Sequence, residues 1–105
     1  MNFAQRLETL PSIEGITRLV LLDAHDQQVA TIENLPGKAG SLRVYHALAA
    51  QHNGLIGPEA AALGLQWFAE HVSDAQANPG KHPNIDRLLG WAAGSATYRV
   101  QVERA

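Results

Sequence analysis

The sequence predicts a single α+β domain in which helices pack on one face of a small, mostly antiparallel sheet of about three strands. Three observations lead to this prediction. Two runs rich in apolar and β-branched residues, 16–22 and 29–34, flank a polar turn. Apolar residues then recur at helical spacing through much of 42–94. The last segment, 97–103, alternates apolar and polar side chains, as a strand with one wet face does.

Size and charge narrow the classes of protein. The chain has 105 residues, a common size for one domain with one core, so we expect a single domain over residues 1–105. Its formal charge of −2 creates no field that attracts nucleic acid or anionic lipid, and we expect neither as a partner. The absence of cysteine excludes disulfides, thiolate catalysis and cysteine-bound zinc.

Residues 1–15 lack the long apolar region of a signal peptide, and no later segment approaches the length of a membrane span. We therefore expect a cytoplasmic protein.

The first elements are a short helix and a hairpin. The helix is predicted from three apolar residues at spacings of four and three, Phe3, Leu7 and Leu10. The two apolar runs that follow are predicted to form the hairpin, with its turn near residues 23–27.

Two larger helices are expected next. Ser41 is the predicted N-cap of the first, which Asn53 and Gly54 should end. The second should start at Pro58, because proline suits a first helical turn, and run unbroken to about Ala77. Its inner stripe repeats at spacings of four and three: Ala61, Leu65, Phe68, Val72 and Ala75.

A short helix over 84–94, capped by Asn84 and stopped by Gly94, should lead into the C-terminal strand. A sheet of about three strands has exposed edges, and an exposed edge can pair with another chain. We therefore expect the protein to form a homodimer.

The glycine-rich loop before the first larger helix is a candidate anion site, because free N–H groups at a helix start bind anions. Its candidate ligand-binding residues are Lys38, Gly40, Ser41 and Arg43. The loop is not a Walker A motif, which places Ser or Thr directly after the lysine. The structural alternative is that Gly37 and Gly40 only permit a tight turn while Ser41 caps the helix.

A second polar loop, residues 81–87, adds His82 and Asp86 as candidate ligand-binding residues. The alternative is a solvated connection with an asparagine cap and an aspartate in the first helical turn. If the protein has a ligand pocket, we expect it between this loop and the loop at 36–43.

No catalytic residue, metal or cofactor is predicted. His46 and His52 lie about 120° apart around one helix, so they cannot share a metal through that helix. His71 is expected to be a packed boundary residue. No serine lies in a GxSxG elbow, and Glu70 and Asp74 are expected on a solvated face. A metal site would need ligands from separate elements, such as His52, His71 and His82 with Glu70 or Asp86.

The segments LPGKAGS, from Leu35, and HPNIDRL, from His82, resemble a small bacterial family of uncharacterised proteins, a domain of unknown function. With the chain length and element order, the resemblance covers nearly the whole chain. It implies a stand-alone bacterial cytoplasmic protein, and it carries no activity, cofactor or catalytic residue.

Two functions remain open on the sequence. The first is a binding or protein-interaction module that self-associates and has no catalysis of its own. The second is a protein, or an enzyme, that binds a small molecule or a phosphate-type anion with the loops at 36–43 and 81–87. Nucleic-acid binding would need a basic patch from Arg6, Arg18, Lys38 and Arg99.

Overall fold

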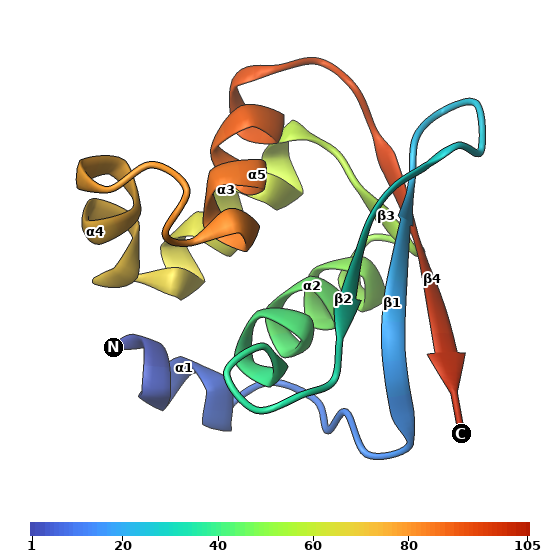
Figure 1. Cartoon of the computed structure of the whole chain (residues 1–105), viewed down its shortest axis with the longest axis horizontal. Coiled ribbons are helices and arrows are strands. Elements are labelled where there is room, and N and C mark those ends of the chain that lie inside the picture. Colours follow the sequence, from blue (N-terminus) through green and yellow to red (C-terminus); the bar gives the residue numbers. More distant parts are fainter.

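The computed structural model describes residues 1–105 as five helices and one antiparallel sheet of four strands (Figure 1). The strands are β1 (Ile16–Leu22), β2 (Gln28–Glu33), β3 (Leu55–Ile56) and β4 (Tyr98–Arg104). The helices are α1 (Phe3–Glu8), α2 (Ala39–Gln51), α3 (Pro58–Phe68), α4 (His71–Ala77) and α5 (Pro83–Ala93).

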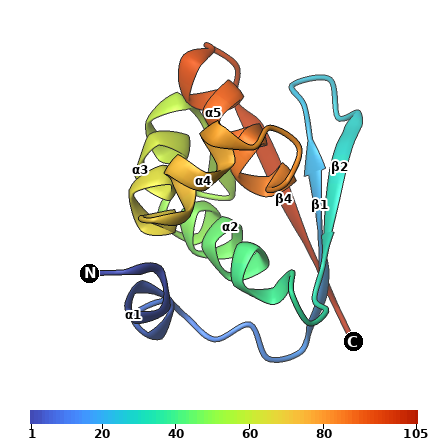
Figure 2. The ribbon, with the colours of Figure 1, turned by 60° about the vertical axis from the view of Figure 1, so that its left-hand side comes forward.

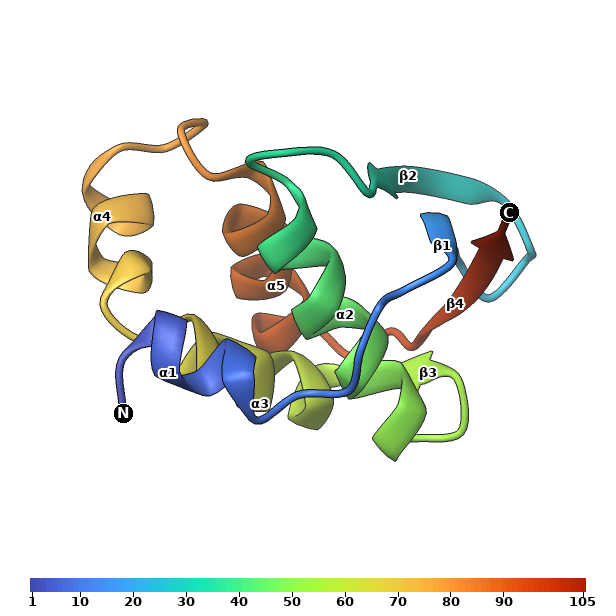
Figure 3. The ribbon, with the colours of Figure 1, turned by 90° about the horizontal axis from the view of Figure 1, so that it is seen from below.

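The sheet order is β2-β1-β4-β3, and all helices lie on one side of the sheet (Figures 2 and 3). The predicted α+β class with helices on one face is confirmed. The sheet has four strands rather than about three. None of the helices combines the length and the apolar character needed to cross a membrane.

The additional strand, β3, has two residues and pairs with β4, Leu55 opposite Arg99 and Ile56 opposite Tyr98. A strand of two residues is too short to show alternation in a sequence. Asn53 and Gly54 end α2 as predicted, with φ of 59° and 84°. The carbonyl of Gly54 accepts a 2.9 Å bond from Val100 N–H, and this bond holds the segment beside β4.

Helix α2 lies between the sheet and the other helices (Figure 2). Its predicted inner residues Leu42, Tyr45, Leu48 and Ala49 are buried, as are Val44 and Ala47. The inner face of the sheet meets this helix with the apolar side chains Leu19, Leu21, Ile32 and Val100. Burial of this apolar surface is the main favourable term that fixes the layer arrangement.

The prediction of one continuous helix over 58–77 is wrong, because the segment forms two helices, α3 and α4. It breaks at Ala69, which adopts φ 50° and ψ −118°, and α4 starts afterwards in a new direction. The predicted stripe still faces inward, because Phe68 and Ala75 are buried on either side of the break. Alanine carries no sequence signal for positive φ. The break is accompanied by a tertiary contact, since Glu70 Oε1 accepts a 2.9 Å bond from Phe3 N–H.

Gly64, in the middle of α3, is a position where one added methyl group should destabilise the protein. A Cβ there would lie 2.7 Å from Leu48 Cδ1 and 2.9 Å from Leu88 Cδ1, and both leucines are fully buried. Overpacking costs about 1–3 kcal/mol, more than the helix propensity gained from alanine. We expect Gly64→Ala to lower the free energy of unfolding by about 1 kcal/mol in urea denaturation.

The matched control is Gly90→Ala in α5. This glycine is exposed, and a Cβ there would meet nothing within 4 Å. The substitution should raise the free energy of unfolding by roughly 0.5–1 kcal/mol. Equal stabilisation by both substitutions would contradict the packing at Gly64.

Candidate functional site

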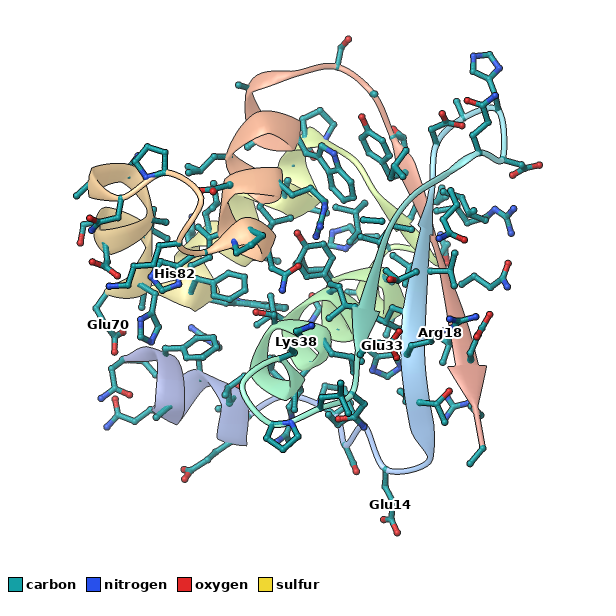
Figure 4. All side chains as sticks on the ribbon, viewed as in Figure 1. Glu14, Arg18, Glu33, Lys38, Glu70 and His82 are labelled. Atoms are coloured by element: carbon teal, nitrogen blue, oxygen red, sulfur yellow. The ribbon has the colours of Figure 1, made fainter.

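A cleft of about 540 Å³ opens where the start of α2 faces the loop between α4 and α5. Lys38 lies on the first wall and His82 on the second (Figure 4). Helix α1 and the end of α3 complete the walls with Phe3 and Phe68. The structure thus brings the two predicted loops, 36–43 and 81–87, to one side of the fold.

The lining of the cleft is basic. The chain contains only two lysines, Lys38 and Lys81, and both line this cleft from different loops. Two of the five histidines, His71 and His82, line it as well. No aspartate or glutamate is among the lining residues, although acidic residues outnumber basic ones in the chain. Both lysine ammonium groups of the chain therefore lie at this cleft, with the Asp74 carboxylate 3.0 Å from Lys81 Nζ.

The start of α2 differs from the prediction. The helix begins at Ala39 with Lys38 as N-cap, because the turn at 35–38 winds directly into the first helical turn. Ser41 therefore does not cap the helix; it lies in the first turn and lines the cleft. The N–H groups of Gly40 and Ser41 donate to no acceptor in the chain. The Lys38 side chain forms no ion pair.

Lys81 and His82 are held by Asp74 of α4. Asp74 Oδ2 lies 2.6 Å from His82 Nε2 and 3.0 Å from Lys81 Nζ. The hydrogen bond with His82, followed by that with Lys81, lowers the pKa of Asp74 to about 2. Asp74 thus positions both side chains at the cleft and offsets part of the Lys81 charge. Lys38 is the cation of the cleft without a carboxylate partner.

The titration of Asp74 checks this arrangement. We expect the NMR shift of the Asp74 carboxyl carbon to give a pKa of about 2. The substitution His82→Gln should move this pKa toward its ordinary value of 3.8. Since the folded pKa lies below the unfolded one, this interaction stabilises the fold above about pH 4 and is lost as pH falls toward 2. His25→Gln, in the distant hairpin turn, should leave the titration unchanged. An ordinary Asp74 pKa in the wild type would contradict the contact.

The remaining wall is aromatic. The ring of Phe3 stacks on Phe68 at 5.2 Å and meets the ring of His71 edge-on at 5.0 Å. The His82 ring follows, 6.1 Å from His71. A Cβ at Gly40 would lie 3.3 Å from Phe3 Cζ, so the glycine leaves room for this ring. The cleft therefore joins a basic wall to a wall of rings.

The predicted site residues divide into two groups. Lys38, Gly40, Ser41 and His82 line the cleft, whereas Arg43 and Asp86 do not. Arg43 lies two residues beyond Ser41, about 200° around the helix, and donates to the carbonyls of Leu10 and Pro11. Asp86 Oδ2 accepts a 2.9 Å bond from Gly80 N–H and closes its own loop.

The ligand-binding roles of the lining residues stay predictions. The structure adds cleft residues that the sequence reasoning did not select, above all Lys81, His71 and Phe3. Of these three residues, Lys81 could have been selected from the sequence, because it directly precedes the candidate residue His82 in the same polar loop.

The structure does not group the residues that nucleic-acid binding or metal binding would need. Arg18 pairs with Glu33 and Glu103, and Arg99 pairs with Asp26 of the hairpin turn. Figure 4 shows Arg18 and Glu33 on the neighbouring strands β1 and β2. The two arginines do not extend the positive charge of Lys38 into a nucleic-acid surface. No group of three or more His, Asp or Glu side chains is placed to hold a metal ion.

Fold and site define a small α+β protein with a ring-lined cleft that carries both lysines of the chain, and with an unpaired sheet edge at β2. Residues 3–102 match the family described as "Uncharacterized protein conserved in bacteria (DUF2322)", and the chain belongs to that family. This membership confirms the resemblance drawn from LPGKAGS and HPNIDRL. No curated protein and no solved structure shows a significant match.

Proposed function

We propose that this protein binds a small phosphate-type anion in the cleft between the loops at 36–43 and 81–87. The observation that carries the proposal is the placement of both lysines of the chain at one cleft, where Lys81 is paired with Asp74 and Lys38 has no carboxylate partner. Such a grouping raises the local concentration of anions even in a protein of negative net charge.

The anion would lie against Lys38 and the start of α2. Lys38 supplies an ammonium group without a carboxylate partner. The free N–H groups of Gly40 and Ser41 add two donors, and the positive end of the helix dipole acts in the same direction. Lys81 and His82 face this point from the second wall, held by Asp74. The site is thus largely formed before a ligand arrives.

The enzymatic alternative would rest on His82. A carboxylate that fixes an imidazole ring, as Asp74 fixes His82, is the arrangement of many acid–base pairs. A reaction also needs a second group that exchanges a proton with the ring, such as a nucleophilic side chain. The His82 ring has no hydrogen-bond partner in the chain besides Asp74. Binding without catalysis is the function that these contacts support best.

Thermal unfolding tests the proposal. A ligand that binds only the native state stabilises it, by about 1.4 kcal/mol at ten times its Kd. In a domain of this size such a gain raises the Tm by roughly 6–11 °C. We expect phosphate to raise the Tm above that in chloride of equal ionic strength. A Tm that follows ionic strength alone would contradict the proposal.

A second function, self-association, is favoured by the edge of β2. No strand pairs with the outer side of β2. Asn34 N–H donates to Thr17 O, so by alternation the N–H groups of Thr31 and Glu33 point outward. The strand has neither the lysine nor the proline with which many edge strands are protected, and Val29 is 47% exposed. We propose that a second copy pairs along this edge.

Light scattering on an eluting size-exclusion peak tests self-association. We expect a dimer for the wild type and a monomer for Thr31→Pro, because proline removes an outward N–H that forms no bond within the chain. Circular dichroism shows whether the variant keeps its fold. A wild-type protein that is monomeric at every concentration would contradict the pairing.

A further inference from the structure

The cleft is larger than an inorganic anion requires. Its volume of about 540 Å³ lies within the range of about 300–1,000 Å³ that is usual for sites of organic ligands. A phosphate group held by Lys38 and the start of α2 would leave the rest of the cleft, on the side of α1 and α4, without contact. The cleft thus has room for a ligand with a body attached to its anionic group.

The lining on that side is made of rings. Phe3 and His71 meet edge-on at 5.0 Å, and the His82 ring stands 6.1 Å from His71. Phe68 is 2% exposed, and its ring stacks on the ring of Phe3 with an angle of 11° between the two ring planes. Aromatic faces and edges of this kind pack against planar apolar groups.

Phe3 packs against the edge of the core and is partly exposed at the cleft. It belongs to α1, a helix of six residues none of which is buried. Its backbone N–H is fixed by Glu70 Oε1, and its ring fits the space that Gly40 leaves free. A large apolar side chain is therefore kept partly exposed beside the two lysines.

We infer that the ligand is an organic anion that carries a planar apolar group, as an aromatic phosphate ester does. The inference rests on the proposed anion site. The phosphate lies against Lys38 and the start of α2, and the planar group packs against Phe3 and His71. Inorganic phosphate and small aliphatic esters make only the first set of contacts.

Binding of two phosphate monoesters of equal charge tests the inference. Phenyl phosphate and methyl phosphate are titrated into the wild-type protein at constant ionic strength, and each Kd is measured by calorimetry. We expect phenyl phosphate to bind about tenfold more tightly, because only it contacts the rings. NMR should also show contacts between the phenyl protons of the ligand and the ring of Phe3.

The variant Phe3→Leu keeps an apolar side chain and removes the ring. It should reduce the preference for phenyl phosphate severalfold and leave the Kd of methyl phosphate unchanged. A parallel loss for both esters would show that Phe3 only holds α1 in place, and would overturn the inference.

The wild-type comparison decides the question even where the variant does not fold. Equal Kd values for the two esters would overturn the inference and leave the anion site intact. Failure of both esters to bind would overturn the proposed function as well.

Discussion

Replacing Lys38 by glutamate is expected to abolish phosphate binding in the cleft while leaving the protein as stable as before. The substitution turns the one cation of the cleft without a carboxylate partner into an anion beside the phosphate position. The fold should not suffer, because the Lys38 side chain makes no cap hydrogen bond and no ion pair. A negative charge at the start of α2 also complements the helix dipole.

The milder substitution Lys38→Gln removes the charge alone. A hydrogen bond to a charged group contributes about 1.5–3 kcal/mol, so the Kd for phosphate should rise about tenfold or more. Arg104→Gln is the matched control, since it removes one exposed positive charge at the end of β4 and should leave the Kd nearly unchanged. An equal loss in both glutamine variants would mean that net charge, and not the cleft, attracts the anion.

Replacing Tyr45 by phenylalanine is expected to lower the free energy of unfolding by about 1–3 kcal/mol. The Tyr45 hydroxyl is the link between α2 and the start of α5: it donates to Asn84 O at 2.6 Å and accepts from Arg87 Nη1 at 3.2 Å. Burial raises the pKa of Tyr45 to about 12, so the hydroxyl remains a donor over the working pH range. Without it, the Asn84 carbonyl loses this hydrogen bond, and Arg87 Nη1 keeps only its bond to Asn84 Oδ1.

Tyr98→Phe is the control for this prediction. The Tyr98 ring stacks on Trp91 at 3.9 Å, and its hydroxyl has no hydrogen-bond partner in the chain. Its removal should change the free energy of unfolding by less than about 0.5 kcal/mol in urea denaturation. If the two substitutions have the same effect, the Tyr45 hydroxyl does not join the two walls of the cleft.

Those parts of the fold that depend on local pattern could be predicted from the sequence. The runs that form β1 and β2 are apolar and β-branched, and the alternation of β4 marks a strand with one wet face. Gly54 and Gly94 stand where helices end. The glycine-rich loop at 36–43 and the polar loop at 81–87 could be selected as candidate ligand-binding loops, because their composition is visible without the fold.

The features that depend on tertiary contacts could not be predicted. An alanine gives no indication in the sequence of a positive φ, yet Ala69 adopts one. This backbone conformation accompanies the hydrogen bond from Phe3 N–H to the side chain of Glu70. That break redirects α4 and so places Asp74 beside Lys81 and His82. Asn84, predicted as a cap, lies inside α5, because Pro83 occupies the first helical position and His82 becomes the N-cap.

The most direct test of the anion site is a titration of ¹⁵N-labelled protein with phosphate, followed by amide NMR at constant ionic strength. The cleft predicts saturable shifts that are largest at Gly40 and Ser41, accompanied by Lys81 and Asn84 across the cleft, all with one Kd. Small shifts that grow linearly without saturation, or saturable shifts confined to residues outside the cleft, would contradict a binding site at the start of α2.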